Sequence, residues 1–269
     1  MPTDRYSRQS FLGDDAQERI RACTVGVVGL GGGGSHIVQQ LAHLGFHHYV
    51  LYDLDCVEDT NLNRLVGATE EDAALHRPKI EIARRQIEVL QPKAHVQAFT
   101  DRWQEHPLPL RSCDIVFGCV DGLAERQQLE VSARRYMIPY IDIGLDIHRR
   151  ESGPPVMAGQ VVMSMPGDPC FSCMGFLNET NLAREAALYG DAGIRPQVVW
   201  ANGVLASTAV GIALHLITGW SEPGHGSLYL QYNGNDMTVQ PHVRLQYLPK
   251  VPCPHFPMNQ VGDPVFRPV

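Results

Sequence analysis

The sequence is short of positive charge and of long apolar runs. It has 22 Lys and Arg against 29 Asp and Glu, a formal net charge of -7, which argues against a protein that grips nucleic acid through a broad basic surface. The longest apolar stretch, near 204–216, is interrupted by Ser207, Thr208, Gly211 and His215. We therefore expect a core helix there and not a membrane span.

The start of the chain lacks an apolar stretch, so no signal peptide is expected. Seven cysteines, an odd number, in a chain without a predicted export signal favour a reducing, cytoplasmic location. With 269 residues, of which 44% are hydrophobic and 19% charged, the chain has the composition of an ordinary globular protein with one substantial core.

Short apolar runs alternate with helical periods in the first half of the chain, which predicts an α/β fold: a Rossmann-like, doubly wound, mostly parallel sheet. After Ile143 the sequence becomes irregular and β-rich, with hairpins expected near 161–165 and 228–232 and a buried helix at 204–217. We expect a nucleotide-binding region at 1–150 and a second region, 151–269, of the same globule. The predicted strands of the first half are 23–28, 49–52, 95–99, 114–117 and 140–143, and its helices are 35–45, 78–90 and 124–136.

A glycine-rich turn joins the first strand to the first helix. It fits the pattern G-x-G-x-x-G, which lets the backbone approach a phosphate, and we expect helix N–H groups at Ser35 and His36 to face the anion. Asp53 ends the second strand, where an acid bonds ribose hydroxyls. The alternative is a tight turn whose glycines serve packing alone. The glycines are Gly29, Gly31, Gly32, Gly33 and Gly34.

Two cations beyond Asp53 favour ATP over NAD. Lys79 follows Pro78 in the first turn of a predicted helix, where the helix dipole disfavours a cation by ~0.3–1 kcal/mol. An anion beside it would explain the placement. Arg64 and Lys79 together are able to neutralise a triphosphate and departing pyrophosphate, although each taken alone is more readily explained as a solvated surface charge.

Asp121 lies between the predicted strand 114–117 and the next helix, at the carboxyl edge of the sheet where ligands of such folds bind. An acid at this place is able to hold Mg²⁺ against phosphates. The alternative is that Asp121 caps the helix, and both roles are compatible.

These residues together resemble the ThiF/MoeB/HesA adenylyltransferases, bacterial relatives of the ubiquitin-activating enzymes. The likeness runs from about Arg5 to Cys253. It is carried by the segment Arg5-Tyr6-Ser7-Arg8-Gln9, the glycine turn, Asp53 to Arg64, Lys79 and Asp121. The resemblance implies a homodimeric, Mg²⁺-dependent enzyme that uses ATP to adenylate the C-terminal glycine carboxylate of a ubiquitin-like or sulfur-carrier protein, or of a peptide.

The resemblance also implies roles for individual residues. Asp53 would bind the ribose, within a nucleotide-binding segment that includes Asp55. Asp121 would bind magnesium, and Arg8 would reach the terminal phosphate from the other subunit. Without the resemblance, Arg8 is simply a charge in a polar N-terminal arm. The residues implied to bind the phosphates are Asn61, Arg64 and Lys79.

A cysteine knuckle, C-x-x-C, stands at Cys170 and Cys173. Members of the resembled family often carry a second C-x-x-C near the chain end, but here Phe256 occupies the fourth place. Cys170, Cys173, Cys253 and His255 still make a candidate Cys3His zinc site, which would hold the chain end onto the second half. The alternatives are a redox pair or plain buried thiols.

The segment 178–199 is expected to cross over the active site in this fold. Many family members carry an acyl-accepting thiol there, but this segment has no cysteine. Cys23, Cys113 and Cys119 lie in or beside core strands and are expected to be inert, which leaves Cys56 as an outside candidate. We hypothesise that the enzyme stops at the acyl-adenylate and that a partner's nucleophile completes the reaction. The polar residues of the segment are Asn178, Glu179, Thr180, Asn181, Arg184, Glu185, Tyr189, Asp191 and Arg195.

Asp142, Asp146 and His148 stand at or beyond the end of the fifth predicted strand, near the expected peptide groove. One reading is that they position the partner's C-terminal tail, but we expect them to cap strand ends or face water. Three other functions remain open. The first is a tRNA threonylcarbamoyladenosine dehydratase-like enzyme of the same superfamily, against which the negative charge argues. The second is an NAD-dependent Rossmann oxidoreductase, which leaves Arg64, Lys79 and Asp121 unexplained. The third is an inactive adaptor that keeps the fold for dimerisation.

Overall fold

The structure, a computed structural model, describes residues 5–150, 152–180, 182–183, 196–221, 228–248 and 253–257. Its elements, in chain order, are η1 (Ser7–Leu12), α1 (Ala16–Ala22), β1 (Thr24–Val28), α2 (Gly32–Leu44), β2 (His48–Tyr52), η2 (Asp59–Asn61), α3 (Glu70–Ala74), α4 (Lys79–Leu90), β3 (His95–Phe99), η3 (Leu108–Ser112), β4 (Ile115–Gly118), α5 (Leu123–Arg135), β5 (Tyr140–His148), β6 (Val156–Ser164), α7 (Val199–Thr218), β7 (Leu228–Asn233), β8 (Thr238–Pro241) and η4 (Val243–Tyr247).

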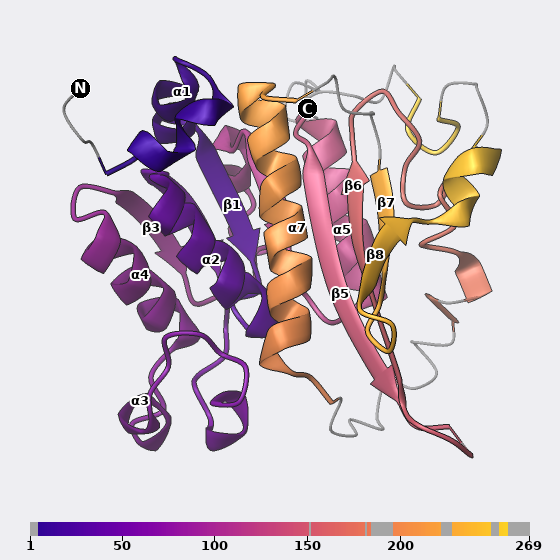
Figure 1. The fold of residues 1–269 in the computed structure, drawn as a ribbon, viewed down its shortest axis with the longest axis horizontal. Helices are drawn as coiled ribbons and strands as arrows, with labels where there is room; N and C mark the ends of the chain where they lie inside the picture. The colour runs from indigo at the N-terminus through magenta and orange to yellow at the C-terminus, as the bar shows by residue number, and fades with distance from the viewer. Residues whose placement is uncertain are drawn as a thin grey trace, which may run out of the picture.

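The strands form a single eight-stranded sheet in the order β3-β2-β1-β4-β5-β6-β7-β8. β1 to β5 pair in parallel, and β5 to β8 pair antiparallel. Figure 1 shows β3 and β1 on the left and the antiparallel strands β5 to β8 on the right. The predicted α/β, Rossmann-like, mostly parallel sheet with a β-rich second half is confirmed. The division of the chain at residue 150 stays a prediction.

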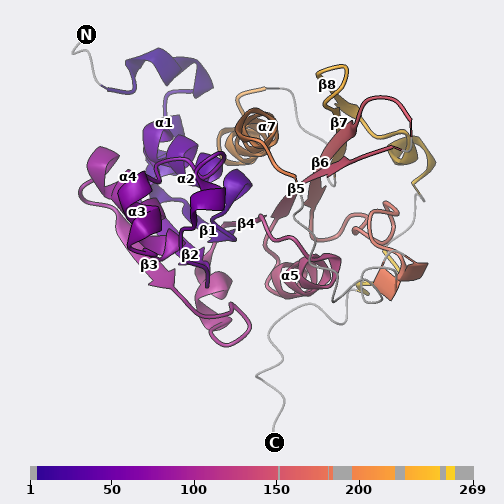
Figure 2. The same ribbon diagram turned by 90° about the horizontal axis from the view of Figure 1, so that it is seen from below.

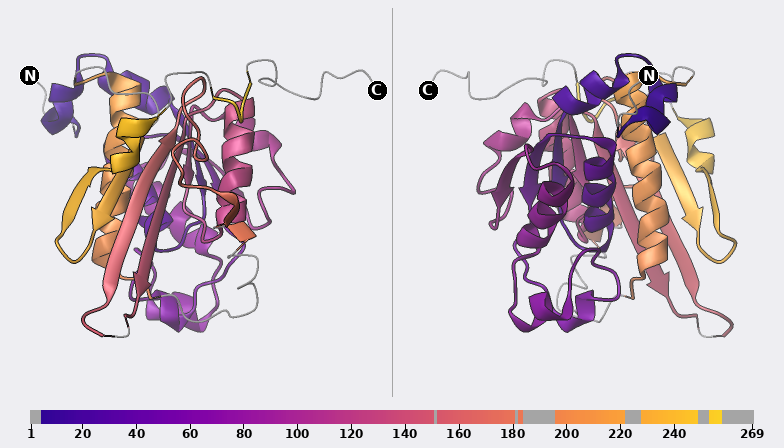
Figure 3. Two further views of the ribbon diagram at one scale, coloured as in Figure 1. Left: turned by 90° about the vertical axis from the view of Figure 1, so that its right-hand side faces the viewer. Right: turned by 60° about the vertical axis from the view of Figure 1, so that its left-hand side comes forward.

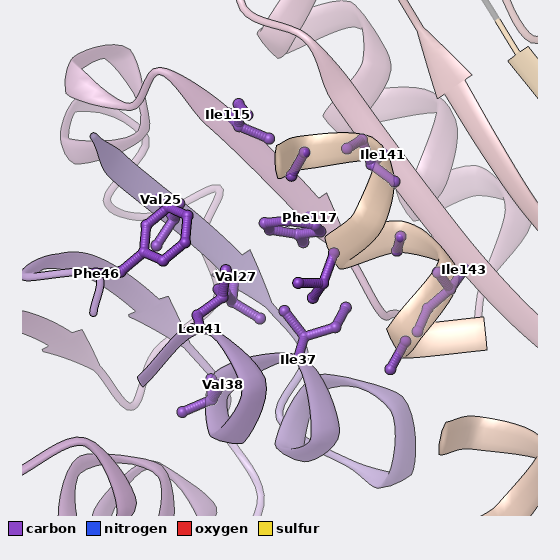
Figure 4. Packing of buried hydrophobic residues seen from close by; sticks show 14 of the residues in the cluster. Val25, Val27, Ile37, Val38, Leu41, Phe46, Ile115, Phe117, Ile141 and Ile143 are labelled. Atoms are coloured by element: carbon purple, nitrogen blue, oxygen red, sulfur yellow. The ribbon is translucent and has the colours of Figure 1, made fainter. Parts of the chain in front are cut away.

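Helices cover both faces of the sheet, because alternate strand residues point to opposite sides. Val27 and Phe117 pack in one core with α2 and α7, whereas Val28 and Val116 pack in the other with α5. Figure 2, seen along the strands, shows α2 and α7 on one side of the sheet and α5 on the other. The side chains of the first core are drawn in Figure 4.

Helix α2 begins three residues earlier than predicted, inside the glycine run. The reason is packing: a Cβ at Gly34 would lie 1.9 Å from the Gly29 carbonyl oxygen, and a Cβ at Gly33 would lie 2.5 Å from Ile143 Cδ1. The glycines lower the helix propensity of this turn, but they allow it to pack closely against Gly29 and Ile143. At the other end Gly45 caps the helix in the left-handed region at φ 96°, as the sequence predicts.

Helix α7 also begins earlier than predicted, at Val199. It is the one helix of the described ranges that is long and apolar enough to cross a membrane. In this fold it lies along α2 and packs on β5 and β6 (Figure 3). These contacts agree with the predicted core helix.

Strand β5 is longer than predicted, because it continues past Ile143 to pair with the whole of β6. Asp142, Asp146 and His148 therefore lie on the strand and not beyond it. Asp146 and His148 are exposed and contact each other at 3.3 Å. Asp142 is fully buried, so the expectation that it caps a strand end or faces water is wrong.

Candidate functional site

The glycine turn closes tightly on the sheet. Gly29 has φ 87°, and a Cβ there would lie 2.5 Å from the carbonyl oxygen of Cys119. Gly31 is different: it is the N-cap of α2, and a Cβ there would meet nothing within 4 Å. The turn is therefore packed against the Cys119 backbone at Gly29, and it has open space next to Gly31.

The free N–H groups at this helix end belong to the glycines. Ser35 N–H donates to Gly31 O at 3.0 Å within the helix, so the prediction that Ser35 and His36 N–H groups face an anion is wrong. The first N–H groups of any α-helix lack intrahelical partners and favour an anion. Those of α2 begin at Gly32, three residues closer to β1 than expected.

Asp53 lies beside the turn, directly after β2. Its carboxylate accepts hydrogen bonds from Leu30 N–H at 2.6 Å and Asp55 N–H at 2.9 Å. Burial raises the pKa of Asp53, and the charge of Lys79 works in the opposite direction. The acid is thus held at the carboxyl end of β2 within the field of the predicted phosphate-binding lysine.

Lys79 is the first residue of α4, and Asp55 is its anion in this structure. The Lys79 Nζ to Asp55 Oδ2 distance is 2.7 Å, with the lysine side chain 11% exposed and the aspartate 57%. Lys79 N–H also donates to Asp55 O, and the backbones of Cys56 and Pro78 form an isolated antiparallel β-bridge. The cation at the helix start therefore has a partner that an incoming phosphate is able to replace.

Arg64 and Asn61 belong to the segment between β2 and α3. Asn61 is buried and accepts from Glu58 N–H at 3.1 Å, so its side-chain oxygen serves the turn. Arg64 is half-buried and donates to Thr60 O at 2.6 Å and Asn63 Oδ1 at 3.0 Å. In this structure the Asn61 side-chain oxygen is therefore hydrogen-bonded within its own turn, and the Arg64 guanidinium is hydrogen-bonded within its own loop.

Asn63 fixes this segment to the start of α7, because it donates to Gln197 O at 3.2 Å. Gln197 in turn lies over the glycine turn: its Oε1 is 3.3 Å from the place of a Cβ at Gly32. Ser35 makes a second link, since its hydroxyl accepts from Val66 N–H. Arg64 is thereby carried on a loop anchored at the glycine turn.

Asp121 lies on the loop that leaves β4 and passes below Gly29. The loop is fixed by Cys119 N–H, which donates to Val28 O at 2.8 Å. Burial raises the pKa of the Cys119 thiol, and the charges of Asp121 and Asp53 add to that rise. Asp121 follows Cys119 by two residues, and the Cys119 carbonyl lies against Gly29, so the loop of Asp121 adjoins the glycine turn. The N-cap of α5 is Gly122, so Asp121 does not occupy the predicted capping position.

A buried ion pair beneath Asp121 was not found from the sequence. Arg126 on α5 contacts the Asp142 carboxylate and donates to Val120 O at 2.6 Å. Tyr140 O–H donates to the other Asp142 oxygen at 2.8 Å. Burial raises the pKa of Asp142 to about 6, and Arg126 limits that rise. Arg126 thus holds the backbone immediately before Asp121.

Arg8 lies far from this group in its own chain. It is exposed on η1, whose neighbour Gln9 donates to Leu44 O at the C-terminal end of α2. The glycine turn is at the opposite end of that helix, roughly 20 Å away at 1.5 Å per residue. The implied contact with a nucleotide in the other subunit stays a prediction.

The four predicted zinc ligands come together. Sγ of Cys173 lies 3.6 Å from Sγ of Cys253, and His255 Nδ1 lies 3.4 Å from Sγ of Cys170 and 3.3 Å from Sγ of Cys173. All four ligand atoms are within 4.8 Å of one another. A tetrahedral zinc needs ligand atoms roughly 3.5–3.8 Å apart. This donor set therefore fits zinc, with His255 in the place of a fourth cysteine.

Two buried charged residues of α5 contact the cysteine knuckle and the segment just before it. Glu130 accepts from Phe171 N–H at 2.8 Å and from the Ser164 hydroxyl at 2.6 Å. Arg134 donates to Asp168 O at 2.6 Å and lies over the Phe256 ring. One helix thus contacts both the knuckle and, through Arg126, the loop of Asp121.

The remaining thiols differ in exposure. Burial raises the pKa of Cys23 and of Cys113 to about 12, so neither is a nucleophile near neutral pH. Cys56 is exposed. Most of the expected crossover segment lies outside the described residues, including Asn181, Arg184, Glu185, Tyr189, Asp191 and Arg195.

Known proteins are similar to this chain in sequence and in fold. The chain is 29% identical over 235 residues to the molybdopterin-synthase adenylyltransferase of Escherichia coli, which covers 84% of this chain and 86% of that protein. It is 30% identical over 244 residues to the SAMP-activating enzyme E1 of Haloferax volcanii, covering 88% and 83%.

Among solved structures, that of E. coli MccB with ATP superposes with a TM-score of 0.70 at 20% identity, covering 89% of this chain and 71% of that one. A similarity at this identity concerns the fold alone. The family model of ThiF matches residues 4–254. The chain therefore belongs to the ThiF family.

Proposed function

We propose that this protein is an ATP-dependent adenylyltransferase that activates the C-terminal carboxylate of a small protein or peptide. The observation that carries the proposal is that four features lie at the carboxyl edge of the parallel strands: the open glycine turn after β1, Asp53 after β2, Lys79 paired with Asp55, and Asp121 on the loop after β4. Among its relatives are proteins named adenylyltransferases, a SAMP-activating enzyme E1 and a ubiquitin-like modifier-activating enzyme.

The residues present fit Mg-ATP. The open space above Gly31 admits a phosphate, and Asp53 follows β2, where ribose is bound in folds of this kind. Asp121 offers a carboxylate, which Mg²⁺ prefers in combination with phosphate oxygens. Magnesium bound there would reduce the charge of the triphosphate.

In the proposed reaction, a carboxylate oxygen of the partner attacks the α-phosphate of ATP. The new bond joins that oxygen to phosphorus, the bond from phosphorus to the β-phosphate oxygen breaks, and pyrophosphate leaves. Lys79 exchanges Asp55 for a phosphate oxygen, and Arg64 adds a second positive charge. Orientation and charge neutralisation supply most of the catalysis.

The proposed substrate is a ubiquitin-like or sulfur-carrier protein, or a peptide, ending in glycine. Relatives support this class, since one is named a sulfur carrier protein ThiS adenylyltransferase and another a SAMP-activating enzyme. We further propose a homodimer in which Arg8 serves the partner's site. The exposed edge-to-face pair of Phe11 and Trp220, on the same end of the molecule as Arg8, supports a subunit contact there.

Trapping tests this function directly. The protein is incubated with Mg-ATP, hydroxylamine and a cell lysate, and the products are searched by mass spectrometry for chains ending in a glycine hydroxamate. We expect a small protein or peptide so modified, dependent on ATP. Exchange of pyrophosphate into ATP stimulated by tRNA, with no hydroxamate, would instead indicate the dehydratase-like function.

We also propose that zinc occupies the cluster of Cys170, Cys173, Cys253 and His255 and supports the fold. Cys173→Ser should abolish the equimolar zinc of the purified protein and lower its melting temperature, because the metal joins the chain end to the knuckle. Metal analysis and thermal unfolding measure both. Cys56→Ser, at an exposed cysteine outside the cluster, is the control and should keep the zinc. Full zinc content in Cys173→Ser would refute the site.

A further inference from the structure

Asn202 presents a buried amide to the glycine turn. It lies in the first turn of α7 and is 5% exposed. A Cβ at Gly32 would lie 2.4 Å from its Nδ2, and a Cβ at Gly33 would lie 3.9 Å from its Oδ1. The amide therefore sits directly against the first turn of α2.

The side-chain nitrogen of Asn202 has no hydrogen-bond partner among the described residues. Buried polar groups are almost always hydrogen-bonded in folded proteins, and an unpaired buried donor costs free energy. Such a donor at the edge of a ligand site indicates a partner that arrives with the ligand.

Two helix N-termini converge at this place. α2 and α7 run side by side with their first residues at the same end, the lower end in Figure 1. At the opposite end Arg19 of α1 reaches Ile217 O near the end of α7. Both helices therefore direct the positive ends of their dipoles toward the glycine turn, which favours an anion there.

The amide faces the turn from the side opposite to Asp53. In the sheet, β2 with Asp53 lies on one side of β1, whereas β5, whose Ile143 contacts Gly33, lies on the other. Asn202 approaches with α7, which packs on β5 and β6. A phosphate at Gly31 would thus have Lys79 and Asp53 on one side and Asn202 on the other.

We propose that the Asn202 side chain donates a hydrogen bond to a phosphate oxygen of the nucleotide bound at the glycine turn. This inference rests on the proposed function, and it makes Asn202 a nucleotide-binding residue contributed by the second half of the chain. Asn63, which donates to Gln197 O just before α7, continues the same rim toward Arg64.

The test compares Asn202→Leu and Asn202→Asp with the wild-type protein by thermal unfolding and calorimetric titration. Leu keeps the branching and the number of heavy atoms of the side chain and removes the unpaired donor, so unfolding without ligand should occur at the same or a higher temperature. Affinity for Mg-ATP should fall by roughly 10- to 100-fold, the size of a hydrogen bond to a charged group. Asp adds a negative charge beside the phosphate and should weaken Mg-ATP binding further.

Adenosine, which lacks phosphate, is the matched ligand control and should bind all three proteins equally. Ser207→Ala, at an exposed position of α7, should change neither stability nor affinity. If Asn202→Leu lowers the unfolding temperature and leaves Mg-ATP affinity intact, the amide caps the helix and the inference is wrong. If wild-type protein binds no Mg-ATP, the proposed function itself fails.

Discussion

Replacement of Lys79 by Ala should weaken Mg-ATP binding roughly 10²-fold and slow pyrophosphate exchange by about 10²–10³-fold, because a fixed cation facing developing charge supplies much of the catalysis. Lys79 is nearly buried at the start of α4 and bonded to an exposed carboxylate, Asp55. Calorimetric titration measures the affinity, and exchange is measured with the substrate found by hydroxamate trapping.

Lys93→Ala is the matched control for Lys79→Ala. Lys93 is also a lysine next to α4, but it is exposed beyond the C-terminal end of that helix, at the amino ends of the parallel strands and so at the opposite edge of the sheet from the glycine turn. The Lys93→Ala variant should leave both the affinity for Mg-ATP and the rate of pyrophosphate exchange unchanged. Equal behaviour of the two variants would show that Lys79 is an ordinary surface charge.

Arg126→Met should destabilise the protein by about 3–5 kcal/mol, since it leaves the Asp142 carboxylate buried without its counter-ion. Arg126 and Asp142 have side chains 7% and 0% exposed, so solvent replaces little of the lost interaction. Denaturant unfolding measures the loss. The double variant Arg126→Met with Asp142→Leu should recover part of it, because no charge then stays buried.

The exposed pair of Arg19 and Asp15 provides the control for the buried pair. Its side chains are 53% and 58% exposed at 2.7 Å, and pairs of this kind contribute ~0–1 kcal/mol. Arg19→Met should therefore change stability little. A similarly small effect of Arg126→Met would contradict the role of Arg126 in holding the loop of Asp121.

Local patterns predicted the parallel half of the fold and the main site positions. The glycine turn, the acid after β2 and the lysine opening α4 each stand next to a local sequence signal, an apolar strand or the start of a helix, so the sequence is sufficient to locate them. The four zinc-ligand candidates were predicted from the C-x-x-C knuckle and from the place of the second cysteine pair in the resembled family, and their meeting is confirmed by the geometry. The roles of the nucleotide-binding residues stay predictions.

Long-range pairs were not predictable in the same way. Arg126 and Asp142 are 16 residues apart on different elements, and nothing local joins them. A signal did exist on α5: Arg126, Glu130 and Arg134 recur at helical spacing, and all are buried on the face of Leu129 and Ala133. Charges interleaved with a buried apolar stripe indicate internal ion pairs and hydrogen bonds.

The extents of β5 and α7 were underestimated for a different reason. Beyond Ile143, β5 alternates small, polar and apolar residues because its far end leaves the core, so no continuous apolar run marks it. The start of α7 contains exposed Val199 and Trp200, which do not follow a simple one-faced pattern. Pairing with β6 and contact with α2, both tertiary, determine these boundaries.

Nucleotide selectivity tests the account most directly: thermal unfolding of the wild-type protein is followed with Mg-ATP and, separately, with NAD. If the two cations and the acid around the glycine turn hold a triphosphate, a saturating concentration near 100 times the dissociation constant adds ~2.7 kcal/mol of stability with Mg-ATP. NAD at the same concentration should add far less. Stabilisation by NAD and none by Mg-ATP would contradict the assignment of this edge of the sheet to adenylation.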